Sequence, residues 1–112
     1  MQKFIAIGRL VKDVEVKITP NGKTVAGFTI AVPRDYKNAE GKYDSDFFNC
    51  QAWGKTGETI GNYVTKGQRL YVEGRLQNRS WEKDGQKHYI TEVIVNSFEF
   101  IEKRENTNMA LS

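Results

Sequence analysis

"DFFNCQAWGKTGETIGNYVTKGQRLYVEGRL", residues 46–76, is the stretch that decides the fold, because it joins two strand-like segments through a short segment of helical character. Residues 47–53 and 69–76 are rich in the β-branched and aromatic side chains that favour strands. Between them, Thr56 is placed to cap a helix and Gly67 to end it. The apolar residues of this segment recur at helical spacing: Ile60, Tyr63 and Val64. We therefore expect one short helix between two strands.

Further strand-like segments lie on both sides of this stretch. They cover residues 4–11, 14–18, 25–32 and 89–100. The turn sequence TPNG at residues 19–22 predicts a hairpin, because proline fixes φ and Asn-Gly accepts positive φ. Asp84-Gly85 predicts a second hairpin. The order strand, strand, strand, helix, strand, strand predicts a mostly β protein, a five-stranded Greek-key barrel of the OB-fold class with its helix between strands 3 and 4.

Length and composition set the broad class of the protein. The 112 residues suffice for one domain, which we expect at residues 1–102 with a short flexible tail at 103–112. Lys and Arg number 17 against 14 Asp and Glu, and the net charge of +3 suits a polyanionic partner without requiring one. One cysteine and one histidine cannot build a four-ligand zinc site, so we expect no metal and no cofactor. No apolar run reaches the ~18 residues of a membrane span, which predicts a cytoplasmic protein without a membrane partner.

The strand at residues 47–53 carries large side chains on both faces. Side chains alternate along a strand, so one face is expected to hold Phe48, Cys50 and Ala52 as core. The opposite face is expected to hold Phe47, Asn49, Gln51 and Trp53. Amides between two rings suit a solvated face, since unpaired amides in a dry interior cost free energy. Exposed rings on such a face favour the stacking of nucleic-acid bases, which contributes roughly 1–3 kcal/mol per base.

Two long connections, residues 33–46 and 77–89, mix cations with aromatic rings. Cations can bind backbone phosphates and rings can stack on bases, so both segments could close over a flexible single strand. Together with the strand faces, they define the predicted nucleic-acid-binding residues: Lys17, Arg34, Tyr36, Lys37, Phe47, Asn49, Gln51, Trp53, Lys55, Arg75, Arg79, Trp81, Lys83 and Lys87.

Other interpretations of the aromatic residues stay open. Phe47 and Trp53 could pack under a loop or against another subunit, and Trp81 could cover an edge of the barrel. The segment FIAIGRLV, residues 4–11, is apolar on both sides, which favours self-association. The predicted subunit-contact residues are Phe4, Ile5, Ile7 and Phe48. No residue pattern supports catalysis, because no nucleophile is placed beside a histidine and no Gly-rich phosphate loop follows a strand.

Four motifs carry a resemblance to a known family. They are IGRL at 7–10, PNGKTVAGFTIAV at 20–32, FFNCQAWGKTGETIGNYVTKGQRLYVEGRLQNRSW at 47–81 and YITEVIVNSFEF at 89–100. As a set they resemble the bacterial and phage single-stranded DNA-binding proteins over residues 3–100.

The resemblance implies an OB-fold that wraps single-stranded DNA and assembles as a homotetramer, with a dimer as the alternative. Trp53 and Trp81 match stacking aromatics of that family, while Phe47 and Tyr36 stand where its members often carry tryptophan. Phe48 occupies a position associated with subunit contact. Frequently basic positions are matched by Lys17, Lys37, Lys55 and Arg79.

We therefore expect sequence-independent binding and protection of single-stranded DNA in replication, recombination or repair, without enzymatic activity. An RNA-binding module and a protein-interaction module remain the alternatives. Typical bacterial members continue through a linker to an acidic tip that recruits repair enzymes, whereas this chain ends in ENTNMALS, so such recruitment is not expected. The expected location is the cytoplasm, in association with the nucleoid, or the host cytoplasm for a phage protein.

Overall fold

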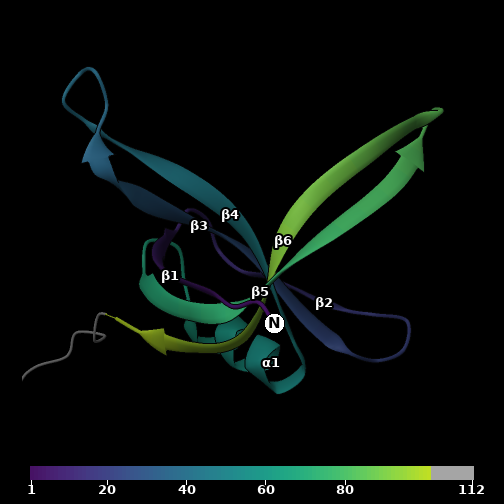
Figure 1. Cartoon of the computed structure of the whole chain (residues 1–112). Helices are drawn as coiled ribbons and strands as arrows, with labels where there is room; N and C mark the ends of the chain where they lie inside the picture. The colour runs from purple at the N-terminus through teal and green to yellow at the C-terminus, as the bar shows by residue number, and fades with distance from the viewer. Residues whose placement is uncertain (102–112) are drawn as a thin grey trace, which may run out of the picture.

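The computed structural model describes residues 1–101, which fold into six strands and one helix (Figure 1). The predicted tail therefore lies outside the described residues. In chain order the elements are β1 (Phe4–Leu10), β2 (Glu15–Ile18), β3 (Thr24–Lys37), β4 (Tyr43–Trp53), α1 (Gly54–Tyr63), β5 (Arg69–Lys83) and β6 (Gln86–Phe100).

Five of the strands close into a barrel. The sheet order is β1-β5-β6-β4-β3-β2, and a short antiparallel pairing between β1 and β3 joins the two sides of the sheet. All neighbouring pairs are antiparallel except β4 and β6, which run parallel. The four-residue β2 adds to the edge of β3 through the predicted hairpin. Because α1 follows β4, it lies between the third and fourth barrel strands, and the predicted OB-fold is confirmed.

The core is filled by the inward faces of the five barrel strands, together with Ile60 of α1 and Val64 directly after it. The fully buried apolar residues are Leu10, Ala26, Phe28, Ile30, Cys50, Ala52, Ile60, Val64, Leu70, Val72, Val93 and Val95. At one edge of this core the rings of Phe4 and Phe48 meet edge to face, with centroids 5.0 Å apart. The predicted alternation of β3 and β4 is confirmed, since Ile30 and Cys50 point inward while Phe47 and Trp53 are exposed.

The helix begins earlier than predicted. Thr56 lies inside α1 and does not cap it; the N-cap residue is Trp53, and it makes no side-chain capping hydrogen bond. Ile60 is buried as its spacing indicated. Gly57, which by intrinsic propensity weakens a helix, allows α1 to pack closely, because a Cβ at this position would collide with the carbonyl oxygen of Ala52.

The two long connections consist mostly of strand, with turns only at residues 38–42 and 84–85. Residues 33–46, named here the β3–β4 arm, and residues 77–89, the β5–β6 arm, continue the ladders of the barrel beyond its core. Figure 1 shows the two arms diverging from the barrel on the side away from α1. The hairpin turn at Asp84-Gly85 was predicted, but the full length of the arm strands was not, because both faces of the arms are largely exposed and the apolar alternation that marks a half-buried strand is missing.

A β-bulge in β6 changes which residues face the core. Glu73 pairs with Ser97 and Gly74 pairs with Val95, so Asn96 is an extra residue on β6. The alternation of β5 continues past this point, while that of β6 reverses: Val95 is buried before the bulge and Phe98 packs on the core after it. A side chain at Gly74 would collide with the backbone of Ile94, so the close approach of the strands here requires glycine.

Candidate nucleic-acid interface

One outer face of the barrel carries the predicted aromatic and amide residues of β4. Residues paired across neighbouring strands share a face, and the ladder aligns Lys17 on β2, Val25 on β3 and Trp53 on β4. Farther along the same face, Phe47 pairs with Ala31. The β3 residues here are small, so the rings of β4 stand above them.

The large rings on this side of the molecule are open to solvent. Phe47 is 65% exposed, Trp53 42% and Trp81 40%. Tyr36, near the tip of the β3–β4 arm, is also exposed. Within residues 1–101, therefore, no loop covers Phe47 or Trp53, and another subunit stays the alternative partner of these rings.

A continuous series of polar contacts connects Trp53 with the β5–β6 arm. The indole Nε1 of Trp53 donates to Oε1 of Gln51 at 3.2 Å, and Nε2 of Gln51 donates to Oε2 of Glu92 at 3.0 Å. The other carboxylate oxygen, Oε1, accepts from Nε of Arg79 at 3.0 Å. We name Gln51, Glu92 and Arg79 the polar bridge, because they link side chains of β4, β6 and β5.

The bridge ends at the second tryptophan. The guanidinium of Arg79 lies 5.1 Å from the centroid of the Trp81 ring, within the range of a cation–π contact. Trp81 also stacks on His88 across the arm, with centroids 5.5 Å apart and an interplanar angle of 21°. His88 therefore packs against Trp81, one of the predicted base-stacking residues. The structure brings Trp53 and Trp81 onto one connected surface, as the sequence reading required.

A shallow groove of about 200 Å³ runs beside the polar bridge. Its lining includes Lys12, Thr29, Asn49, Gln51 and Glu92. The hydroxyl of Thr29 donates to Oδ1 of Asn49 at 3.1 Å, which holds the amide in place on the floor of the groove. Asn49 and Gln51 therefore line one groove on the face that carries Phe47 and Trp53.

A second hollow, of about 560 Å³, borders Trp53 on the other side. It is lined by Gly22, Lys23, Thr24, Trp53, Gly54 and Glu58. Lys23 was not among the predicted residues, because an isolated lysine in a turn has no pattern that distinguishes it from an ordinary solvated side chain. Lys55, in the first turn of α1, is an exposed predicted cation close in sequence to Trp53.

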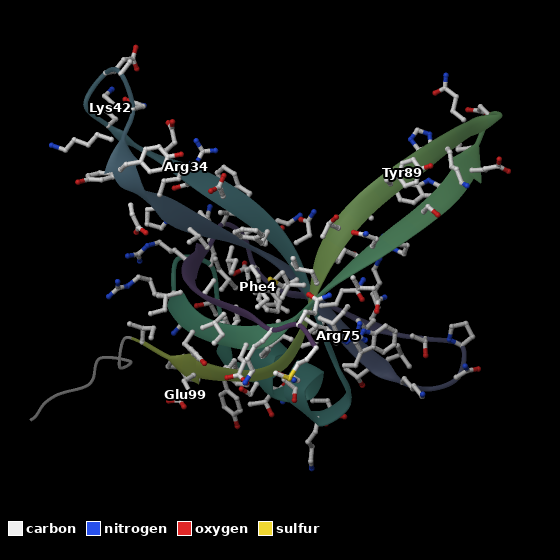
Figure 2. The ribbon with its side chains drawn as sticks, viewed as in Figure 1. Phe4, Arg34, Lys42, Arg75, Tyr89 and Glu99 are labelled. Carbon is white, nitrogen blue, oxygen red and sulfur yellow. The ribbon has the colours of Figure 1, made fainter. Side chains whose placement is uncertain are left out.

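The predicted cations of the β3–β4 arm have partners of their own. Nη2 of Arg34 lies 2.9 Å from Oδ1 of Asp46, and its Nε lies 3.2 Å from both carboxylate oxygens. These hydrogen bonds lower the pKa of Asp46 and raise that of Arg34. Nζ of Lys37 lies 5.9 Å from the centroid of the Tyr43 ring. Figure 2 shows Arg34 on this arm and Lys42 near its tip.

The predicted cations in and next to the β5–β6 arm lie on both faces of its strands. Arg75 donates to Oε1 of Gln77 at 2.8 Å and shares the face of Arg79 and Trp81. Lys83 lies two residues after Trp81 and therefore projects from the same face. Lys87 pairs in register with Glu82, so it projects from the opposite face, as does Tyr89 (Figure 2). The geometry therefore separates Lys87 from the surface formed by Trp53, the polar bridge and Trp81, named here the tryptophan surface.

Glu92 is the functional candidate that sequence reasoning missed. The acidic residues looked scattered along the chain, and the role of Glu92 depends on the parallel pairing of β4 with β6, a long-range contact that local patterns do not record. The sequence contained one indication: Glu92 directly precedes the apolar run of β6 and lies an even number of positions after His88, so the two side chains share a face. That parity places it on the tryptophan surface.

Other kinds of site receive no support from residues 1–101. Within this range no group of three or more His, Cys, Asp or Glu side chains could hold a metal ion. Cys50 is buried, as predicted, and burial raises the pKa of its thiol to about 12, so the nucleophilic thiolate is suppressed. No helix in the described part of the chain is long and apolar enough to span a membrane.

Comparisons with known proteins identify relatives of the chain. The chain is 46% identical over 108 residues to "Single-stranded DNA-binding protein 1" of Streptococcus pyogenes serotype M18, covering 96% of this chain and 83% of that relative. It is 46% identical over 105 residues to the "Single-stranded DNA-binding protein" of Bacillus cereus, covering 93% and 62% of the two chains.

A solved structure has the same fold. The crystal structure of a deletion mutant of the single-stranded DNA binding protein from Thermus aquaticus matches with a TM-score of 0.77 at 27% identity, covering 93% of this chain and 52% of the other. The family model described as "Single-strand binding protein family" matches residues 1–101. The chain belongs to the single-strand binding protein family.

Proposed function

We propose that the protein binds single-stranded DNA without sequence preference and protects it during replication, recombination or repair. The observation that carries this proposal is the connected surface on which Phe47, Trp53 and Trp81 are exposed beside basic side chains. Aromatic rings stack on any base, and cations neutralise the backbone, so this chemistry suits a single strand of any sequence. The protein acts by binding and not by catalysis, and its place is the cytoplasm, at the DNA.

A titration with oligo-dT tests the proposal. Both tryptophans lie on the proposed surface, so binding should quench their fluorescence, and affinity should fall as salt concentration rises. A matched oligo-rU titration addresses the RNA-binding alternative, because a protein that depends on the 2′-OH binds RNA more tightly. Unchanged tryptophan fluorescence on addition of DNA would instead favour a surface for another protein.

We further propose that the protein assembles through the outer face of β1, as a homotetramer. Ile5 is 57% exposed and Ile7 48% exposed, and they border an apolar-rich hollow of about 820 Å³ that Tyr71 also lines. Exposed apolar patches of this kind commonly mark protein contacts. Polar groups flank them, since Glu73 binds Nζ of Lys3 at 2.9 Å and the hydroxyl of Tyr71 at 2.8 Å.

Phe4 and Phe48 contribute to this proposal in a different way. Both are half-buried and packed on the core, so they support β1 and β4 from inside. β1 pairs with β3 only at Arg9 and Leu10, which leaves the edge formed by its first residues without a strand partner among residues 1–101. A second copy pairing along this edge would satisfy its backbone groups.

A further inference from the structure

Glu92 is a buried acid on a surface that we propose binds a polyanion. Glu92 is 6% exposed, and among residues 1–101 no other charged residue is buried. Burying a carboxylate costs free energy unless it is paired and hydrogen-bonded, and a negative charge here also opposes phosphate. Its presence therefore calls for a role that outweighs both effects.

The contacts of Glu92 indicate that role. Each carboxylate oxygen accepts one hydrogen bond, Oε2 from Gln51 on β4 and Oε1 from Arg79 on β5. Since Nε2 of Gln51 is held by the carboxylate, its Oε1 is presented to the indole N–H of Trp53. On the other side, the held guanidinium of Arg79 lies against the ring of Trp81.

We infer that Glu92 is a positioning residue that fixes the two tryptophans relative to one another, and that Arg79 supports Trp81 and does not act as a phosphate ligand. The inference rests on the proposed binding of single-stranded DNA. It revises the predicted role of Arg79, which the sequence alone grouped with the phosphate-binding cations.

Arg79 and Lys83 lie on the same face of β5, but of the two only Arg79 has its charge compensated by an ion pair among residues 1–101. A cation that binds phosphate releases counterions, and each such contact on a single strand contributes about 0.7 to the slope of log K against log salt. The charge of Arg79 is already matched by Glu92 at 3.0 Å, so it has little to release. Lys83 shares the face of Trp81 and forms no ion pair among residues 1–101, which makes it the matched control.

Salt-dependent oligo-dT titrations of Arg79→Gln and Lys83→Gln test the inference. Both side chains are exposed, and in Arg79→Gln the amide Nε2 takes the place of the arginine Nε and can still donate to buried Glu92, so both variants should fold. Arg79→Gln should keep the wild-type slope while weakening binding about tenfold at every salt concentration, because the ring of Trp81 loses its support. Lys83→Gln should lower the slope by about 0.7. A similar decrease in Arg79→Gln would overturn the inference.

The variant Glu92→Gln supplies an independent readout. It keeps the shape of the side chain and removes the charge, so Arg79 becomes an uncompensated cation and the slope should steepen by about 0.7. A residue that served stability alone would change the melting temperature and leave the slope as it was, which would also overturn the inference. If Glu92→Gln does not fold, Arg79→Gln decides alone. Absence of DNA binding by the wild-type protein would instead refute the proposed function.

Discussion

Arg34 and Asp46 form a two-pronged ion pair across the β3–β4 arm, with Nη2 and Nε of the guanidinium both within 3.2 Å of the carboxylate. Asp44 lies at the edge of the same group, 4.0 Å from Nη1 of Arg34. The arm has little buried apolar surface, so contacts of this kind contribute to its order. They also occupy the guanidinium that the sequence assigned to DNA.

This ion pair predicts a pH dependence for the stability of the arm. Hydrogen bonds from Arg34 lower the pKa of Asp46 in the folded protein, so its stabilising effect is complete above the ordinary aspartate pKa of about 4. The effect is lost as the pH falls through the lowered value. Amide hydrogen exchange in the arm should therefore be faster in Arg34→Gln than in wild type at neutral pH, and the difference should vanish in strong acid. A difference that persists there would contradict this assignment.

The exposed tryptophans should dominate stacking. Trp53→Ala and Trp81→Ala should each weaken oligo-dT binding about 5- to 150-fold, the range expected for one stacked base. Each should also reduce the fluorescence quenching seen on binding. Tyr63→Ala is the matched control, because Tyr63 is an exposed aromatic residue on α1 outside the proposed surface. Equal affinity of wild type and both tryptophan variants would remove the stacking account.

Lys55 should contribute through its charge. Because this exposed lysine follows Trp53 on α1, Lys55→Ala should lower the slope of log K against log salt by about 0.7. Lys66→Ala, which removes an equal charge outside the predicted surface, should leave the slope near that of wild type. The idea fails if the two variants give the same slope as each other.

The outer face of β1 should control assembly. Ile7→Lys places a charge in the proposed subunit contact and should lower the molar mass measured by light scattering, because burying an unpaired charge is unfavourable. Ile18→Lys makes the same change at a 65% exposed position on β2 and should leave the mass unaltered. If the Ile7→Lys variant has the same molar mass as the wild-type protein, the subunit contact does not lie on the outer face of β1.

Gly57 should respond in the opposite sense to an ordinary helical glycine. Replacing a helical glycine with alanine normally stabilises a protein by about 1 kcal/mol, but a Cβ at this position meets the carbonyl oxygen of Ala52. Gly57→Ala should therefore lower stability by about 1–3 kcal/mol, as overpacking does. Thermal unfolding measures the change, with Glu58→Ala as the control at an exposed position of α1. A rise in melting temperature would show that α1 can move away from β4.

The barrel could be predicted because its strands have two unlike faces. Ile30 and Cys50 alternate with Thr29 and Asn49, and that period of two marks a strand with one side in a core. The turn at residues 19–22 has the residue types that its hairpin requires. Local chemistry and the final structure agree wherever a core is present to separate the faces.

The full length of the arm strands and the polar bridge could not be predicted, because both depend on pairing between strands and not on the pattern within one segment. Residues 77–83 are exposed on both faces, so their strand state depends on pairing with residues 86–92 and leaves no apolar alternation in the sequence. Glu92 reaches Gln51 only because β4 and β6 run parallel and adjacent. Such proximity is a property of the closed barrel and not of either segment.

The extra residue at Asn96 gives β6 two working surfaces. Before it, the outward side chains include His88 and Glu92, which serve the tryptophan surface; after it, Ser97 and Glu99 pair with Glu73 and Tyr71 beside the proposed subunit contact. The bulge reverses which residues of β6 face outward, so even-numbered residues belong to the first surface and odd-numbered residues to the second. Under the two proposals, one strand contributes side chains to DNA binding before Asn96 and to assembly after it.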